Sequence, residues 1–379
     1  MGGPAAPGMT RRVLLDARVL STRQPTGLSR YAATLFEHLV RRGRCEYLVA
    51  DGGTGVVPGA RALPFDVPLG DGSGAARWLS AICRLYDVDL VFSPYLPVPA
   101  IPGTPLVLTV HDLIALDHPE WFADASVARL FTGPLRASAR DAHQLITGSV
   151  DAAASIVRHY GVERSRITVV PHAAARTFTP GPRRERPQVA ALVGSDPFIL
   201  SVATLEPRKN IARLVEAFEI IREREPGTPR RLVLAGRLGW RCGSILDRIS
   251  ASPYHGDIVH LGHVDEQALI DLYRSCAVCA YVSLAEGFGL PVLEALACGA
   301  VVVASDIPVL REVAGDAALY CNPAEAASIA DGICRGLTDP AAAEVLREAA
   351  IRRAGSFDWE RTAAATERVF EAALAGYRG

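Results

Sequence analysis

The feature that most constrains this sequence is a regular alternation of short apolar runs with helical patterns, which occurs twice along 379 residues. Strands separated by helices predict parallel βαβ units with helices on both faces of a sheet. The sequence therefore predicts an α/β chain with two doubly wound parallel sheets, and its length excludes a single small module. The runs begin at residues 12, 47, 89, 105, 144 and 167 in the first block, and at 197, 230, 257, 279, 300 and 317 in the second.

A stretch rich in proline, glycine and arginine separates the two blocks, at residues 173–196. This composition is typical of a linker between domains. Beyond the last apolar run the sequence is helical in pattern, and it ends in a periodic run over 359–377 that needs an apolar surface to cover. We expect one domain over 1–180, a second over 197–355, and a terminal helix over 356–379.

Charge and composition narrow the classes of function. The formal net charge is −1, which argues against nucleic acid as the main partner because phosphate backbones require a basic surface. With 49% hydrophobic residues the chain can bury large cores, and no apolar stretch is long enough for a membrane helix or a signal peptide. The eight cysteines are scattered, which favours reduced thiols. These features predict a cytoplasmic protein with at most peripheral membrane contact.

A glycine-rich segment follows the apolar run at 279, and it reads EGFGLPVLE over 286–294. Gly287 and Gly289 let the backbone approach a ligand, and Pro291 suits the first turn of a helix. Free N–H groups and the helix dipole at such a start favour an anion such as phosphate. The alternative is an ordinary helix start with an acidic residue that stabilises the dipole.

Two glutamates flank this glycine turn. Glu294 is expected in the first turn of the helix, where it would repel a phosphate, so we assign it to the hydroxyls of a ribose, as in dinucleotide sites. Glu286 precedes the glycines, and we expect it to face a cleft and accept hydrogen bonds from the hydroxyls of a second sugar.

The second candidate site contains the chain's one lysine. Of the 40 basic residues, 39 are arginine, and the exception is Lys209, which follows Arg208 in the sequence EPRKN after an apolar run. Lysine is a compact, mobile charge, whereas arginine is a planar fork. Two cations opposite a glycine-rich helix start could hold a diphosphate without a metal. The alternative is that Lys209 is present by chance in a sequence with biased codon use, and that Arg208 and Lys209 are a solvent-exposed pair.

The first block carries two further candidates. Gly27 lies in the segment QPTGLSRY before a helical pattern, where it would bring backbone N–H groups close to a ligand. His111 ends the run LVLTVHDL, together with Asp112. A histidine at the end of a parallel strand can donate a hydrogen bond to a reacting substrate, although a structural histidine is an equal alternative.

These motifs together resemble the retaining GT-B glycosyltransferases of family four. The resemblance rests on the glycine before SRY, TVHDL, EPRKN and EGFGLPVLE, in that order along the whole chain. It implies two Rossmann-like domains that face each other across a cleft, and a last helix that returns to the first domain. It also implies transfer of a sugar from a nucleotide-diphosphate sugar to a hydroxyl acceptor, with retention and without a metal or other cofactor.

The same resemblance assigns roles to individual residues. Arg208 and Lys209 would stabilise the diphosphate leaving group, Glu294 would hold the ribose, and Glu286 would hold the donor sugar. His111 would contact the transferred sugar, and Gly27 would lie against the phosphates. The donor-binding segment includes Gly287, Phe288, Gly289 and Leu290. One departure concerns the end of the first domain, where His172 and Ala173 stand in place of the more common Asn and Gly.

Three motifs are interpreted as decoys. Asp87 and Asp89 form a DxD sequence, but at the entry of a strand, the wrong edge for a site in a parallel sheet. Cys276 and Cys279 form a CxxC without a second ligand pair at zinc spacing, which favours buried thiols. The glycines of 53–59 are followed by no helical pattern, which predicts a loop.

Donor and acceptor are less constrained than the reaction class. The TVHDL segment resembles that of members that use GDP-mannose, so GDP-mannose is our prediction, with a UDP-sugar as the alternative. The acceptor is a glycan, a lipid-linked sugar or a small molecule, because acceptor contacts come from variable loops. Two other function classes stay open: a GT-B-fold epimerase or hydrolase of nucleotide sugars, and a sugar-binding protein without catalysis.

Overall fold

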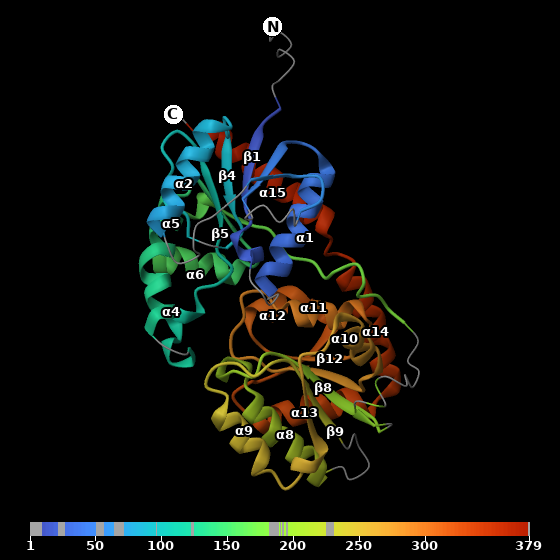
Figure 1. The fold of residues 1–379 in the computed structure, drawn as a ribbon. Coiled ribbons are helices and arrows are strands. Elements are labelled where there is room, and N and C mark those ends of the chain that lie inside the picture. The colour runs from blue at the N-terminus through green and yellow to red at the C-terminus, as the bar shows by residue number, and fades with distance from the viewer. Residues whose placement is uncertain are drawn as a thin grey trace. The chain divides into compact units, whose positions relative to one another are not determined.

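The computed structural model describes residues 10–21, 27–50, 57–63, 72–95, 97–122, 125–181, 189, 191, 193–194, 196–224 and 231–377. The chain divides into two compact units (Figure 1). The first unit consists of Met1–Leu116, Ala128–His172 and Trp359–Gly379, and the second consists of Asp117–Val127 and Ala173–Asp358.

The first unit is built on a seven-stranded sheet with the order β3-β2-β1-β4-β5-β6-β7. All neighbouring strands pair in parallel. The strands are β1 (Arg12–Asp16), β2 (Glu46–Ala50), β3 (Arg61–Leu63), β4 (Leu90–Ser93), β5 (Leu106–Thr109), β6 (Gln144–Thr147) and β7 (Ile167–Val169).

Helices cover both faces of this first sheet. On one face, Leu14, Leu108 and Leu145 pack in a core shared with α2, α5 and α6. On the other face, the ring of Phe92 lies 6.1 Å from that of Phe36 in α1 and 5.2 Å from that of Phe370 in α15. The helices are α1 (Gly27–Arg42), α2 (Gly72–Leu85), α5 (Arg136–Asp141), α6 (Val150–Tyr160) and α15 (Trp359–Gly376).

Helix α15 is therefore part of the first unit although it ends the chain. Figure 1 shows it in red beside α1 in blue. Arg42 at the end of α1 donates to Glu360 and Glu367 of α15, and the Tyr47 hydroxyl donates to Glu367 at 3.2 Å. Apolar packing and ion pairs thus both fasten the last helix to the sheet.

The second unit is built on a six-stranded sheet with the order β10-β9-β8-β11-β12-β13, again with parallel neighbours. The strands are β8 (Phe198–Val202), β9 (Arg231–Ala235), β10 (Ile258–Gly262), β11 (Val278–Tyr281), β12 (Val302–Ser305) and β13 (Ala318–Cys321). The helices are α8 (Ile211–Arg224), α9 (Gly243–Ser250), α10 (Glu266–Ser275), α11 (Leu290–Ala297), α12 (Pro308–Ala314), α13 (Ala326–Thr338) and α14 (Pro340–Ala354).

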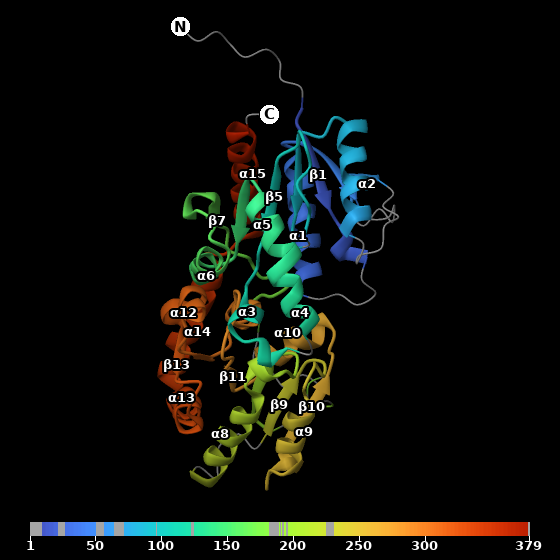
Figure 2. The ribbon, with the colours of Figure 1, turned by 90° about the vertical axis from the view of Figure 1, so that its left-hand side faces the viewer.

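Alternate residues of each strand in this second sheet point to opposite cores. Ile199, Leu232 and Val303 pack with α8 and α13, whereas their strand neighbours Leu200 and Val233 pack on the other face with α10, α11 and α12. Figure 2 shows the helices on the two sides of the strands. A strand buried on both faces needs a continuous apolar run, which is the pattern that the sequence shows.

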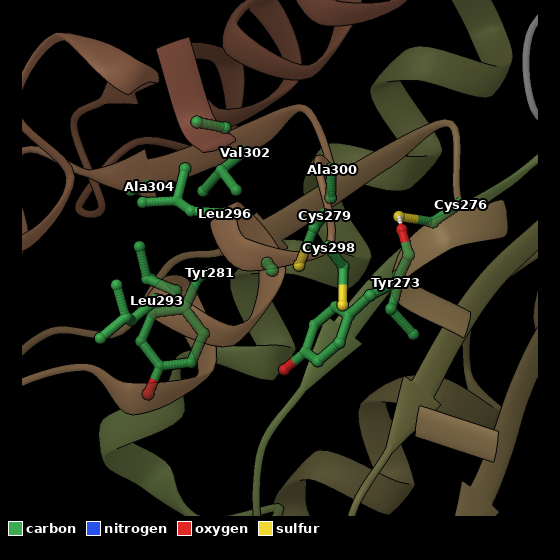
Figure 3. Packing of buried hydrophobic residues seen from close by; sticks show 14 of the residues in the cluster. Tyr273, Cys276, Cys279, Tyr281, Leu293, Leu296, Cys298, Ala300, Val302 and Ala304 are labelled. Carbon is green, nitrogen blue, oxygen red and sulfur yellow. Dashed lines mark hydrogen bonds between the residues drawn. The ribbon is translucent and has the colours of Figure 1, made fainter. Parts of the chain in front are cut away.

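One of these cores contains a group of thiols. Cys276, Cys279 and Cys298 are buried, unoxidised and surrounded by apolar side chains near Tyr273 (Figure 3). Burial raises the pKa of the Cys298 thiol to about 12. These cysteines are inert packing residues, as the sequence predicts for the CxxC pair.

The expected fold class is confirmed in both units, with three local differences. Strand β3 is not foreseen, because it has only three residues and begins with an exposed arginine. The single amphipathic helix that the sequence favours over 127–142 is instead divided into α4 (Ala125–Leu130), a π-helical turn over Phe131–Leu135 that contains a proline, and α5. A short helix, α3 (Ile114–Asp117), precedes this region. Over the described residues, no helix has both the length and the apolar character that a membrane crossing requires.

Candidate active site

In the second unit, the candidate residues meet because β8 and β11 are parallel neighbours whose carboxyl ends lie at one edge of the sheet. The segment after β8 carries Arg208 and Lys209, and the segment after β11 carries Glu286. The backbone N–H of Leu284 donates to the carbonyl of Arg208 at 2.9 Å, which ties the two segments together. Residues 78 positions apart are brought into direct contact.

A buried ion-pair network forms at this edge. Arg208 donates from Nε and Nη2 to Oε1 of Glu206 at 3.1 and 2.7 Å, and from Nη1 to Oε2 of Glu286 at 2.7 Å. Lys209 Nζ donates to Oε1 of Glu286 at 2.5 Å and to the Tyr281 hydroxyl at 2.9 Å. That hydroxyl donates to the same Glu286 oxygen at 2.8 Å. We call Glu206, Arg208, Lys209, Tyr281 and Glu286 the Glu286 cluster.

The electrostatics of the Glu286 cluster follow from its burial. The Glu286 side chain is only 7% exposed. Burial alone would raise its pKa, but the charges of Arg208 and Lys209 outweigh burial and lower the pKa to about 2. Burial, and then the neighbouring Arg208 charge, lower the pKa of Lys209. The cluster therefore contains two cations and two carboxylates, and each cation has an anionic partner already in place.

The loop that bears the two cations is fixed by its backbone. Pro207–Lys209 form one turn of 3₁₀ helix, and Asn210 then takes a left-handed conformation with φ of 59° before α8 begins. The Asn210 amide donates to the carbonyls of Val282 and Pro323 at 3.1 and 2.8 Å. A rigid support of this kind holds a charged group in place before a ligand arrives.

Helix α11 begins beside this cluster in sequence and depends on a glycine. Gly289 has φ of 97°, and a Cβ atom there would lie 2.7 Å from Cδ2 of Leu310. The backbone conformation therefore favours glycine, and a Cβ atom would also displace the end of the Leu310 side chain. Pro291 lies in the first turn, as predicted. The first turn of α11 carries no acidic residue, so its N–H groups stay suited to an anion.

In the first unit, three strand ends bring a histidine pair together. Pro94 follows β4, His111 follows β5 and His172 follows β7. His111 Nε2 lies 2.8 Å from the Pro94 carbonyl oxygen, and its Nδ1 lies 3.3 Å from Nε2 of His172. Burial lowers the pKa of His111, and burial together with His111 lowers the pKa of His172 well below its ordinary value. We call His111 and His172 the histidine pair.

Aromatic rings pack around the histidine pair. The ring centroid of Tyr31, from α1, lies 4.8 Å from that of His111 and 4.4 Å from that of His172. Trp359, at the start of α15, lies 5.9 Å from Tyr31. Tyr31, His172 and Trp359 are buried, whereas His111 is partly exposed. The exposed side of His111 is therefore the part of the pair that a ligand can reach.

Two family models match the chain in succession. "Glycosyltransferase Family 4" matches residues 25–174, and "Glycosyl transferases group 1" matches residues 182–353. O-antigen chain mannosyltransferase B of Escherichia coli is 30% identical over 271 residues, which is 70% of this chain and 70% of that protein. The chain is a GT-B glycosyltransferase of family four.

Solved structures agree with this fold. The transferase is similar to sucrose-phosphate synthase from Thermosynechococcus elongatus, with a TM-score of 0.76 and 20% identity over 97% of this chain and 100% of that one. It is also similar to HepE from Anabaena, solved in complex with UDP, with a TM-score of 0.74 and 18% identity over 96% of this chain and 100% of that one.

The structure revises one expectation for the glutamates of the transferase and adds to another. Glu294 lies in the second turn of α11, not the first, because the helix begins at Leu290. It accepts a hydrogen bond from the Tyr273 hydroxyl at 3.2 Å. Glu286 is expected to face a cleft, and within the second unit its carboxylate is already engaged by Arg208 and Lys209.

The structure also refines the expectations for the first unit. His111 is expected to offer an N–H to a substrate, but both ring nitrogens are engaged inside the unit. Gly27 is the exposed first residue of α1, and a Cβ atom there would meet nothing within 4 Å. The described residues around Gly27 therefore leave room for a side chain at this position.

Besides the cysteine pair described above, two motifs of the sequence are interpreted as decoys. Asp89 accepts a hydrogen bond from the backbone N–H of Arg12 at 2.8 Å, at the amino end of β4, so the predicted edge is confirmed. Residues 53–56 lie outside the described residues. In the part of the chain that the structure describes, no group of three or more His, Cys, Asp or Glu side chains is arranged to hold a metal ion.

Sequence reasoning missed three members of these sites. Glu206 and Tyr281 belong to the Glu286 cluster, and His172 belongs to the histidine pair. Glu206 stands two residues before Arg208 at the carboxyl end of a strand, which was the available signal. His172 was noticed only as a departure from the family pattern, because nothing in the sequence links it to a residue 61 positions away.

Proposed function

We propose that this chain transfers a sugar from a nucleotide-diphosphate sugar to a hydroxyl acceptor, with retention of the anomeric configuration and without a metal ion. The observation that carries the proposal is the pair of adjacent cations, Arg208 and Lys209, held at the carboxyl edge of the second sheet. Such preorganised cations stabilise the negative charge that develops on a diphosphate leaving group. They supply the charge that a divalent metal supplies in other transferases.

Donor binding would change the partners within the Glu286 cluster. Glu286 pairs with both Arg208 and Lys209, so an incoming diphosphate competes with that carboxylate for both cations. We propose that the phosphate oxygens take over these contacts and that Glu286 then accepts hydrogen bonds from hydroxyls of the transferred sugar. Glu294 would bind the ribose, and the backbone of Gly287, Phe288, Gly289 and Leu290 would approach the donor.

The first unit would complete the reaction. His111 would contact the transferred sugar and Gly27 would lie against the phosphates. In the chemical step the bond from the anomeric carbon to the diphosphate oxygen breaks, and the acceptor oxygen forms its bond on the same face. The leaving diphosphate carries the electron pair of the broken bond, and its oxygen accepts the proton of the acceptor hydroxyl. We propose that residues 1–180 bind the acceptor and that residues 197–355 bind the donor.

The identity of the donor is proposed from the relatives. The E. coli relative is a mannosyltransferase, which supports mannose and, with the TVHDL segment, GDP-mannose. HepE was solved with UDP, which supports a UDP-sugar as the alternative. The acceptor is proposed to be a glycan, a lipid-linked sugar or a small molecule. A cytoplasmic location, with at most peripheral membrane contact, stays a prediction.

A panel of nucleotide sugars tests the proposed function. The cognate donor should raise the melting temperature, because a ligand at 100 times its Kd stabilises the folded state by about 2.7 kcal/mol. Release of nucleoside diphosphate should require an added acceptor, and the product should keep the donor's anomeric configuration by NMR. Release without an acceptor would indicate a hydrolase instead. Loss of activity in EDTA, restored by manganese, would contradict metal independence.

A further inference from the structure

The structure determines which ring nitrogen of His111 carries a proton. The Pro94 carbonyl oxygen, 2.8 Å from His111 Nε2, can only accept a hydrogen bond. His111 Nε2 must therefore carry a proton. Because burial lowers the pKa of His111, the ring is neutral and its second nitrogen, Nδ1, has no proton.

The other nitrogen of His111 then requires a donor. The group that lies against Nδ1 is Nε2 of His172, at 3.3 Å. A bare ring nitrogen accepts a hydrogen bond, so His172 must be protonated at Nε2. The direction of both hydrogen bonds follows: His172 donates to His111, and His111 donates to the Pro94 carbonyl.

His172 is packed inside the first unit. His172 is 4% exposed and lies directly after β7, while the Tyr31 ring is packed against both imidazoles. His111 is the member that ligands can reach. The buried His172 thus supports the more accessible His111. In the same way, a residue that does not touch a ligand can orient the residue that does.

We propose that His172 is a positioning residue for the transfer reaction: its Nε2–H donates to Nδ1 of His111 and, together with the Pro94 carbonyl, holds that ring in one orientation toward the transferred sugar. The proposal rests on the proposed contact between His111 and that sugar. His172 itself touches no substrate and acts only through His111. It also gives a physical reason why Asn, the common residue at this place in the family the sequence resembles, and His can serve alike, since both present an N–H donor.

Nitrogen NMR on the full chain tests the arrangement without any activity measurement. In ¹⁵N-histidine-labelled protein at neutral pH, His111 should show a protonated Nε2 and a bare, hydrogen-bonded Nδ1. His172→Phe removes the donor but keeps a ring: the Pro94 carbonyl still holds the Nε2 proton of His111, and Nδ1 should lose the ¹⁵N shift of a hydrogen-bonded nitrogen. His172→Asn keeps a donor, so the wild-type pattern of His111 should persist.

Kinetics then test the positioning role. His172→Phe should lower kcat about tenfold or more with little change in the donor KM, since misplacement of a reacting group lowers the rate more than binding. His172→Asn should keep most of the activity. In a His111→Phe background, His172→Phe should add no further loss, because the two changes act through one interaction. A merely structural role would produce the same additional loss in either background.

Several results would overturn the proposal. A bare Nε2 on His111 in the wild-type chain would do so even if every variant failed to fold. So would an unchanged Nδ1 shift of His111 in His172→Phe, equal activity loss in the Phe and Asn variants, or a change of that shift without a kcat change. By contrast, full activity of His111→Phe would overturn the proposed sugar contact, while the NMR result for the pair would stand.

Discussion

The two units place opposite kinds of chemistry at the carboxyl edges of similar sheets. In the second unit the Glu286 cluster gathers two cations and two carboxylates in a buried network. In the first unit the histidine pair is neutral, because burial lowers the pKa of both imidazoles, and aromatic rings surround it. The same strand-end position thus supports a charged site in one unit and an uncharged one in the other.

The difference teaches how each site responds to the loss of one member. Removing one partner of a buried ion pair leaves an uncompensated charge, which costs several kcal/mol. Removing one neutral hydrogen-bond donor costs less, on the order of 1–3 kcal/mol. The Glu286 cluster should therefore be sensitive to any change of charge, and the histidine pair should be sensitive mainly to the direction of its hydrogen bonds.

The largest expected effect is on turnover when a cation of the Glu286 cluster is removed. Arg208→Ala and Lys209→Ala should each lower kcat by about 10²-fold or more, the scale of losing one preorganised charge stabiliser. Lys209→Arg should also be impaired, because the compact ammonium meets both Glu286 and the Tyr281 hydroxyl, which a planar guanidinium cannot reproduce. Steady-state kinetics with saturating donor would measure these losses.

A matched control for these cation variants is Arg224→Ala. Arg224 lies at the end of α8 in a solvent-exposed pair with Asp331, so its removal should leave kcat unchanged. Near-normal turnover in both Arg208→Ala and Lys209→Ala would contradict the assignment and would remove the contrast between the two edges.

The two glutamates should separate by ligand, with smaller effects. Glu294→Gln should weaken nucleoside diphosphate and nucleotide sugar alike, by about 1.5–3 kcal/mol, the size of a hydrogen bond to a charged group. Glu286→Gln should weaken the nucleotide sugar, whereas binding of the diphosphate alone should not weaken, because the diphosphate competes with that carboxylate for the two cations. Calorimetry with the two ligands side by side would measure the difference.

Tyr281→Phe sharpens the experiment on Glu286. It removes the hydroxyl that joins Lys209 to Glu286 while it leaves all four charges in place. Its effect on both ligands should be smaller than that of Glu286→Gln. Equal weakening of both ligands by both glutamate variants, with lower melting temperatures of the free proteins, would mean that the glutamates only hold the loop.

The smallest expected effect is on the pH dependence of stability. The folded pKa of His172 lies below the ordinary value of 6.5, so the unfolded chain binds a proton first as the pH falls. The stability that a neutral His172 contributes is therefore fully present above about pH 6.5 and is lost as the pH falls toward the folded pKa. Between pH 7.5 and 5.5, the melting temperature of His172→Asn should therefore fall less than that of the wild-type chain. A difference of about 1 kcal/mol corresponds to about 2–4 °C.

The control for this pH effect is His263→Asn, a change at an exposed histidine of the second unit. It should leave the pH dependence of melting as in the wild-type chain. A steeper loss of stability at low pH in His172→Asn than in the wild-type chain would reverse the expected sign and contradict the neutral state of the pair.

Much of the fold could be predicted from the sequence, because strands buried on both faces must be written as continuous apolar runs. For example, Val301, which precedes β12, and Val302–Ala304 within it are all apolar. They alternate between the two cores. Strand β3 could not be predicted in this way, since it lies at the sheet edge, where one neighbour and little burial leave no apolar run.

The candidate site was predictable only as far as chain position determines it. Arg208, Lys209 and Glu286 follow neighbouring strands, so parallel topology brings them to one edge. That Glu286 binds both cations is a matter of side-chain geometry, and no spacing encodes it. Likewise, the sequence places His111 and His172 after two strands, but the hydrogen bond between them depends on burial and ring orientation.

The position of α15 in the chain determines when the first unit can complete its folding during synthesis. Trp359 packs against Tyr31, and Phe370 packs against Phe92 beside Phe36 of α1, so this face of the first sheet is covered by α1 alone until α15 is made. At about 5–20 residues per second, the stretch from His172 to Trp359 takes on the order of 10–40 s to synthesise. Throughout that interval one face of the first sheet lacks α15 while the second unit is synthesised. The unit that is begun first is therefore the last to be completed.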